Sequence, residues 1–365
     1  MRHSASPAPV RLTVRAASSL YTVEIAAGLS RTLAATLDTA KLPPRRFIVS
    51  SPTVWRFHGE RFRTASAEEP ILIPDGERFK TLATAGRVYD GLVKAQADRG
   101  CALIAIGGGV IGDMAGFAAA TFLRGIPVAQ VPTTLLAQVD SAIGGKTGVN
   151  HPLGKNLIGA YHQPSVVVVD PELLATLPRR EFRAGLYEVV KYGVIASRRL
   201  FERIDAELTP LFARESVSLI PVIAESCGIK ARVVAEDERE SGPRRVLNFG
   251  HTAGHALEAI TRYRRFRHGE AVAYGMLAAA EIAFARGVLP AADLDALRAL
   301  IVKMGPLPPI ADLETSQVLE AVARDKKIVE GTLHYVLPAA IGRTIIAADV
   351  TGGELGEALR RMGLR

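Results

Sequence analysis

The stretch CALIAIGGGVIGD, residues 101–113, joins an apolar run to a glycine-rich turn. A buried strand that ends in glycines and then opens a helix lets backbone amides approach a pyrophosphate closely. Gly107, Gly109 and Gly112 satisfy the G-x-G-x-x-G spacing, although this pattern is weak evidence by itself. No acid follows about twenty residues later, where an ordinary dinucleotide-binding fold carries one. The stretch favours a nucleotide site on a parallel sheet, and a tight packing turn without a ligand remains the alternative.

Residues 101–123 form an apolar segment that is also long enough to span a bilayer. Its one charged residue, Asp113, falls near the middle, where a charge costs about 2.5–3.5 kcal/mol. We therefore expect a buried strand, a turn and a buried helix here, and no membrane contact.

Short β-type runs alternate with helical patterns on both sides of this stretch. They are RLTVRA (11–16), YTVEIA (21–26), RFIVSS (46–51), ILIPDG (71–76), IPVAQVP (126–132) and SVVVVD (165–170). The first two predict a hairpin, and the alternation predicts a mainly parallel sheet with covering helices. After Pro178, helical patterns dominate to about Met304, and residues 333–348 predict a small hairpin. The fold class is α/β plus all-α, with a Rossmann-like nucleotide-binding domain over 1–178 and a helical metal-binding domain over 179–365.

Length and composition agree with two globular domains. The chain has 365 residues, of which 48% are hydrophobic and 22% charged, and single cores stop growing at about 250–300 residues. Its two cysteines lie far apart, and the N-terminus shows no apolar signal segment, so we expect a cytoplasmic protein. The net charge of +8 permits nucleic-acid binding, but no nucleic-acid motif accompanies it. We expect the charge to steer a small anionic substrate.

Histidines in the second half suggest a metal site. In LNFGHTAGHALEAI, residues 247–260, His251 and His255 project from one face of a helix, and His268 follows at an expected helix start. Glu188 lies on an apolar helix pattern, where an acid needs a partner. Two imidazoles and a carboxylate leave one position open on a tetrahedral zinc, the usual catalytic arrangement. Capping or core histidines remain the alternative.

Polar residues among glycines suggest an anion site. Two adjoining segments, DSAIGGKTGVN (140–150) and HPLGKN (151–156), place lysines among glycines. This composition suits contact with an anion better than it suits a packed core. Further polar residues stand at turns or near the histidines: Glu77, Lys80, Thr133, Thr134, Lys191, Lys230, Glu240, Arg244 and Asn248. A surplus of cations near a metal suits a substrate that carries phosphate and carboxylate groups. Taken singly, each lysine is most often a surface residue.

Residues 107–164 resemble the signature of the dehydroquinate synthase family, in the sugar-phosphate cyclase superfamily. Residues 247–258, 268–276 and 324–338 continue the resemblance in the right order, from about Val10 to near the end. The resemblance implies that most NAD⁺ contacts lie in the N-terminal domain and the metal in the helical one, with the active site between them. It implies zinc on Glu188, His251 and His268, with cobalt as a substitute. It also implies a homodimer in which Arg124 reaches the neighbour's phosphate site.

The remaining site residues are carried over from the same resemblance. The cofactor contacts are Glu77, Lys80, Gly108, Gly109, Asp113, Thr133, Thr134, Asp140, Lys146, Lys155 and Thr176. The substrate contacts are Asp140, Lys146, Lys155, Asn156, Lys191, Lys230, Arg244, Asn248, His255 and Lys326, with Arg124. The residues with catalytic roles are His255, Lys146, Lys191, Lys230 and Asn248. Two positions depart from the pattern, because Ser51 stands where an acid or amide usually holds a ribose, and Tyr187 replaces a small residue.

The reaction that the resemblance implies is a phosphate-eliminating lyase step of the shikimate pathway, toward chorismate and the aromatic amino acids. The substrate, 3-deoxy-D-arabino-heptulosonate 7-phosphate, is oxidised transiently by NAD⁺, loses phosphate, is reduced again and closes by an intramolecular aldol step. His255 is expected to assist proton transfer. The alternatives are another sugar-phosphate cyclase, or a metal-dependent polyol or glycerol dehydrogenase that would consume NAD⁺.

Overall fold

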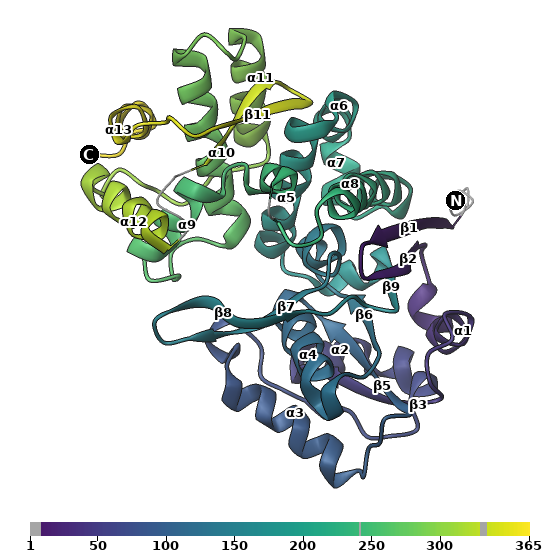
Figure 1. Ribbon diagram of the computed structural model, residues 1–365. Helices are drawn as coiled ribbons and strands as arrows, with labels where there is room; N and C mark the ends of the chain where they lie inside the picture. Colours follow the sequence, from purple (N-terminus) through teal and green to yellow (C-terminus); the bar gives the residue numbers. More distant parts are fainter. Residues whose placement is uncertain (1–8, 241, 329–333) are drawn as a thin grey trace. The chain divides into compact units, whose positions relative to one another are not determined.

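The computed structural model describes residues 9–240, 242–328 and 334–365, with the side chains of 325–328 left out. The chain forms two compact units (Figure 1). The sheet unit contains the chain up to Pro178 together with Ala213–Arg239, and the helical unit contains Arg179–Phe212 and Glu240–Arg365. We expected a single boundary near residue 178. The observed units depart from it in one segment, because residues 213–239 belong to the sheet unit.

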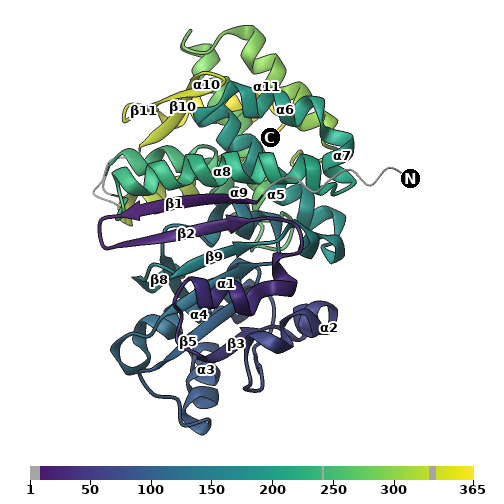
Figure 2. The same ribbon diagram turned by 90° about the vertical axis from the view of Figure 1, so that its right-hand side faces the viewer.

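The sheet unit is built on seven strands in the order β1-β2-β9-β6-β5-β3-β4. Figure 2 labels β1, β2, β9, β5 and β3 of this sheet. Their bounds are β1 Val10–Ala16, β2 Ser19–Ile25, β3 Arg45–Ser50, β4 Ile71–Leu72, β5 Cys101–Gly107, β6 Val128–Pro132 and β9 Val166–Val169. Strand β1 pairs antiparallel with β2, and all other pairs are parallel. The predicted hairpin and parallel sheet are confirmed.

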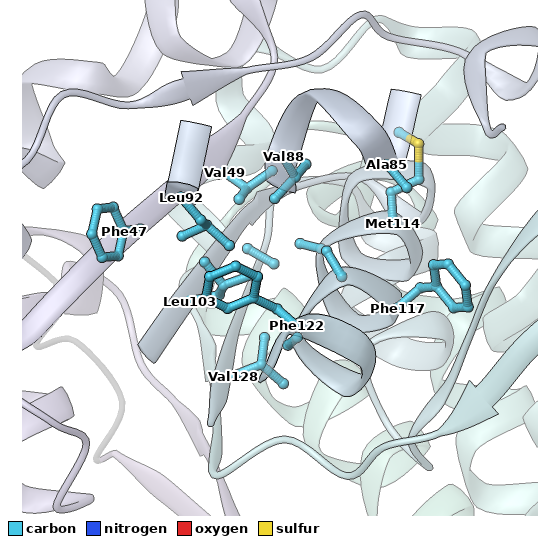
Figure 3. Packing of buried hydrophobic residues seen from close by; sticks show 14 of the residues in the cluster. Phe47, Val49, Ala85, Val88, Leu92, Leu103, Met114, Phe117, Phe122 and Val128 are labelled. Atoms are coloured by element: carbon cyan, nitrogen blue, oxygen red, sulfur yellow. The ribbon is translucent and has the colours of Figure 1, made fainter. Parts of the chain in front are cut away.

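Strand β5 shows why its sequence is apolar throughout. Cys101, Leu103 and Ala105 belong to one core, which the helices α3 (Leu82–Lys94) and α4 (Gly109–Thr121) cover (Figure 3). The alternate residues, from Ala102 to Ile106, belong to a second core on the other face. A strand buried on both faces has no polar position in its period of two. Among the described residues, none of the helices combines the length and apolar character that crossing a bilayer requires.

The helix α8 (Ser216–Glu236) belongs to the sheet unit although it follows helices of the other unit in the sequence. It packs against β1, as Figure 2 shows. Cys227 and Lys230 of α8 both bond to the turn at residues 138–140. The sequence pattern alone gives α8 no mark that distinguishes it from its neighbours. The other helices of this unit are α1 Leu33–Thr39 and α2 Pro52–His58.

The glycine-rich segment that we read as anion-binding loops forms a second hairpin, β7 (Lys146–His151) and β8 (Gly154–Tyr161). Its strands approach so closely that a Cβ on Gly159 would stand 2.3 Å from the Thr147 carbonyl oxygen. Glycine is needed for this close approach. Because glycine is disfavoured in strands, the sequence of this segment did not predict β7 and β8.

The helical unit contains eight described helices and a small hairpin. Their bounds are α5 Arg179–Ala196, α6 Arg198–Ala206, α7 Leu208–Phe212, α9 His251–Ile260, α10 His268–Ala285, α11 Ala291–Lys303, α12 Thr315–Ile328, α13 Gly352–Arg361, β10 Tyr335–Ala340 and β11 Arg343–Ala347. The predicted C-terminal hairpin is confirmed by the antiparallel pairing of β10 with β11.

Glycines bring α5, α9 and α10 into close contact. A Cβ on Gly275 of α10 would stand 1.7 Å from the Gly250 carbonyl oxygen, directly before α9. A Cβ on Gly269 would stand 1.9 Å from the Ala184 carbonyl oxygen of α5. Such contacts between backbones leave no room for a side chain. They fix how the three helices present their polar residues to one another.

Candidate metal centre and nucleotide site

Four polar side chains meet where α5, α9 and α10 touch, and we call Glu188, His251, His255 and His268 the metal centre. Glu188 is fully buried, and its Oε1 lies 3.8 Å from His251 Nε2 and 3.5 Å from His268 Nε2. Ligand atoms of the three histidines all lie within 4.8 Å of one another. The predicted helix start at His268 and the shared face of His251 and His255 are confirmed.

The Glu188 carboxylate supports a cation at this centre. Among the described residues, none donates a hydrogen bond of ordinary geometry to either of its oxygens. Lys191 Nζ lies 2.5 Å from Oε2 as an ion-pair partner, and Oε1 faces the two imidazoles. A buried carboxylate oxygen without a donor is costly. A metal ion among these oxygen and nitrogen atoms removes that cost, so the residues fit zinc.

Hydrogen bonds orient two of the imidazoles. His251 Nδ1 lies 3.1 Å from the Phe249 carbonyl oxygen, which only accepts, so Nδ1 carries the proton and Nε2 keeps its lone pair. His268 Nδ1 lies 3.4 Å from Oε2 of Glu258, a buried acid on α9. Partners of this kind hold metal-binding histidines in one tautomer. Our sequence analysis missed Glu258, which its place seven residues after His251 on the same helix could have signalled.

Local charges act differently on the two rings. Burial, and then the Lys191 ammonium, hold the pKa of His251 well below its usual value, which favours the neutral form that binds metal. Burial also lowers the pKa of His268, but the Glu258 hydrogen bond and the Glu188 charge outweigh it and raise that pKa.

His255 is the exposed member of the metal centre. Its ring centroid lies 5.2 Å from that of His251 and 5.8 Å from that of His268. The geometry thus offers two donor sets, the three histidines or Glu188 with His251 and His268. The second set, expected from the sequence, stays a prediction.

In the sheet unit, the carboxyl ends of β5 and β6 lie side by side. Thr133 N donates to the Gly107 carbonyl oxygen at 2.9 Å, and a Cβ on Gly108 would stand 3.1 Å from Thr134 Cγ2. Gly108 precedes α4 and offers no side chain to cap its first amides. These amides can therefore bind a pyrophosphate, and the turn fits a dinucleotide. We call this turn, with residues 77–80 and 150–156, the nucleotide edge.

A buried lysine links three segments of the nucleotide edge. Lys80 Nζ donates to Asp113 Oδ2 at 2.5 Å and to Asn156 Oδ1 at 2.6 Å. Burial raises the pKa of Asp113, against the opposing charge of Lys80. Lys155 Nζ lies 3.8 Å from Glu77 Oε1. The structure thus brings together five of the expected cofactor and substrate contacts.

Other expected site residues of the sheet unit have partners of their own. Lys230 Nζ donates to the Asp140 carbonyl oxygen at 2.8 Å and also to its carboxylate. Thr176 Oγ1 lies 2.8 Å from His58 Nε2. Lys146 and Arg124 are exposed.

Two of the expected substrate contacts in the helical unit lie in the segment just before α9, and His255 lies on α9 itself. Asn248 Nδ2 donates to Glu240 Oε1 at 2.8 Å, and Arg244 is buried. Lys326 lies outside the described side chains.

Ser51 and Tyr187, the two residues that depart from the family pattern, are both buried. Ser51 is buried, and its Oγ accepts a hydrogen bond from Val54 N at 3.2 Å, which caps α2. The Tyr187 ring is buried beside Glu188 in the sequence, and burial raises its pKa to about 12.

Family comparisons match the chain in two adjoining parts. Residues 70–184 match the model described as 3-dehydroquinate synthase N-terminal, and residues 185–328 match 3-dehydroquinate synthase C-terminal. The 3-dehydroquinate synthase of Thermosynechococcus vestitus is 48% identical over 94% of this chain and 96% of its own. That of a Synechococcus strain is 46% identical over 96% and 98%.

Solved structures show the same architecture. The 2-epi-5-epi-valiolone synthase of Streptomyces hygroscopicus, with NAD⁺ and Zn²⁺ bound, is 28% identical with a TM-score of 0.85 over 94% of this chain and 96% of that one. A 2-deoxy-scyllo-inosose synthase with carbaglucose-6-phosphate, NAD⁺ and Co²⁺ is 26% identical with a TM-score of 0.86 over 96% and 99%. A probable glycerol dehydrogenase of Sinorhizobium meliloti, 19% identical with a TM-score of 0.63 over 92% and 94%, shares the fold.

Proposed function

The chain belongs to the 3-dehydroquinate synthase family, and on that premise we propose that it converts 3-deoxy-D-arabino-heptulosonate 7-phosphate to 3-dehydroquinate and phosphate. The reaction is that of a phosphate-eliminating lyase in the shikimate pathway. The observation that carries this conclusion is the 48% identity with a 3-dehydroquinate synthase over 94% of the chain. The solved cyclases with other products are 26–28% identical, which disfavours their reactions here.

The two cofactors supply chemistry that the side chains lack. When bound, zinc polarises substrate hydroxyls, and NAD⁺ takes up a hydride that it later returns. We propose that Glu188, His251 and His268 hold the metal, because their atoms face one another around an otherwise unsatisfied carboxylate oxygen. His255 is exposed next to these rings, and we assign it the holding and transfer of a proton at a ring nitrogen.

The nucleotide edge binds the dinucleotide in this proposal. The amides of Gly108 and Gly109 receive the pyrophosphate, because the start of α4 has no side-chain cap. The remaining cofactor contacts are Glu77, Lys80, Asp113, Thr133, Thr134, Asp140, Lys146, Lys155 and Thr176. Lys80 is preorganised for this role by its two short hydrogen bonds.

Cationic and other polar side chains position a small molecule that has two anionic ends. We assign this task to Asp140, Lys146, Lys155, Asn156, Lys191, Lys230, Arg244, Asn248, His255 and Lys326. Holding phosphate and carboxylate in place lowers the entropic part of the barrier. Lys191 is almost fully buried at the metal centre, so its ammonium adds positive charge where the substrate oxygens would approach.

We further propose a cytoplasmic homodimer in which Arg124 completes the phosphate site of the second chain. Leu123, Arg124 and Gly125 all have positive φ angles, of 49°, 70° and 124°. Side chains other than glycine adopt such angles only under strain, and strained turns cluster at functional positions. The turn presents Arg124 to solvent, where a second chain can reach it.

Phosphate release tests the proposed function. The purified chain, with zinc and NAD⁺, should release phosphate from the heptulosonate phosphate and much less from glucose 6-phosphate or sedoheptulose 7-phosphate. Faster release from either of the other two sugars would instead support a different cyclase.

A further inference from the structure

Asn150 occupies an irregular position in the β7–β8 hairpin. Val149 pairs with Ile158 and His151 pairs with Gly154, so the register shifts across Asn150. Its backbone amide therefore does not serve the regular ladder and donates to the Lys80 carbonyl oxygen at 2.7 Å. A break of this kind turns a residue toward other parts of the fold.

The Asn150 side chain joins two further segments of the nucleotide edge. Nδ2 donates to Glu77 Oε1 at 2.8 Å and lies 3.4 Å from the Glu77 carbonyl oxygen. Oδ1 accepts from the backbone amide of Asn156 at 2.9 Å. Because that amide only donates and the carboxylate only accepts, the orientation of the Asn150 amide is fixed.

These partners carry the polar contacts at the nucleotide edge. Lys80 reaches Asp113 and Asn156, and Glu77 lies close to Lys155. Asn156 has a φ of 55°, an angle that its hydrogen bond to Asn150 helps to hold. One amide thus links residues 77–80 to residues 150–156, and through Lys80 to α4.

We propose that Asn150 is a positioning residue for NAD⁺ binding, holding Glu77, Lys80 and Asn156 in the places from which they contact ligands. This inference rests on the proposed function, which makes these residues cofactor and substrate contacts. The Asn150 amide supplies both the donor toward Glu77 and the acceptor toward the Asn156 backbone amide from one side chain. An aspartate at this position would set a second carboxylate against Glu77, and an alanine would make neither bond.

Calorimetric titration of NAD⁺ into the zinc-loaded protein tests the proposal. Asn150→Ala and Asn150→Asp should each raise the Kd for NAD⁺ about ten- to a hundredfold, since misplaced polar groups lose their bonds to the ligand. The zinc content should stay at the wild-type value, because the proposed ligands lie on α5, α9 and α10. Val93→Ala, at a 65% exposed position of α3 in the same unit and outside the nucleotide edge, is the control and should keep the wild-type Kd.

A double-mutant cycle separates positioning from loss of stability. In Asn150→Asp combined with Glu77→Gln, donor and acceptor are exchanged, so a hydrogen bond can form again. The double variant should bind NAD⁺ about tenfold more tightly than the two single effects predict together. The positioning role would be overturned by additive effects in the cycle, or by a Kd within threefold of wild type in both Asn150 variants. In either case, phosphate release by the wild type would still support the proposed function. A wild type that binds no NAD⁺ would overturn both.

Discussion

The metal centre and the nucleotide edge are built in different ways. The four side chains of the metal centre come from three helices whose backbones are in contact at glycines. The side chains of the nucleotide edge come from turns and a hairpin that are joined by hydrogen bonds. Glu188 is fully buried, and Gly269 and Gly275 leave no space for a methyl group. At the edge, Lys80 and Asn150 hold the segments together. The first region is fixed by shape and the second by polar bonds, so they should fail differently.

Removal of a metal ligand should have the largest effect. Glu188→Gln and His268→Ala each delete one of three proposed ligands, so each should lose tight zinc binding and nearly all phosphate release. His255→Ala should keep zinc and lose rate. Metal analysis after dialysis measures this. Full zinc in Glu188→Gln, together with loss of zinc in His268→Ala and His255→Ala, would show that the three histidines are the ligands.

Adding a methyl group to α10 should have the next largest effect. Gly275→Ala places a Cβ against the Gly250 carbonyl oxygen, so we expect the free energy of unfolding to fall by about 3 kcal/mol and zinc to bind more weakly. Gly86→Ala in α3 is the control, because no atom lies within 4 Å of its Cβ. It should stabilise the protein by about 0.5–1 kcal/mol, since alanine favours helix over glycine. Denaturant titration of both variants is the measurement, and equal midpoints would contradict the close contact of α9 and α10.

Arg124 tests whether the phosphate site for the substrate needs a residue from a second chain. Loss of one charge-assisted phosphate contact costs roughly 1.5–3 kcal/mol, so Arg124→Ala should lower kcat/KM about ten- to a hundredfold without unfolding. When it is coexpressed with Lys155→Ala, heterodimers should contain one site with both defects and one with neither. Activity above that of either parent is expected. A mere average, although heterodimers form, would mean that Arg124 acts within its own chain.

Glu258 tests how far the metal centre depends on residues behind the ligands. Glu258→Gln keeps the shape but weakens the hold on His268 Nδ1, so zinc affinity should fall about tenfold, because outer partners of this kind contribute 10- to 100-fold. Chelator competition measures it, and the Co²⁺ spectrum should shift as the ring turns. An unchanged spectrum and affinity would show that the 3.4 Å contact does not orient the ring.

Periodicity predicted most of the fold, because strands such as β5 and the hairpin β10–β11 are apolar at the positions that their cores require. It missed β7 and β8, whose pairing depends on glycine backbones and not on apolar alternation. It also gave α8 to the wrong neighbours, since a helix carries no sign of which sheet it will cover. At the site, residue types and spacing indicated His251 and His268, but Glu258 and Asn150 act through other side chains and leave a weaker trace.

The ratio of phosphate released to NAD⁺ supplied tests the central claim most directly. The account predicts that the zinc-loaded protein, given the heptulosonate phosphate and a trace of NAD⁺, releases phosphate in large excess over NAD⁺ while the NADH absorbance stays flat, because the hydride returns to the substrate in each cycle. NADH that accumulates in step with turnover would contradict the account and identify the chain as a dehydrogenase.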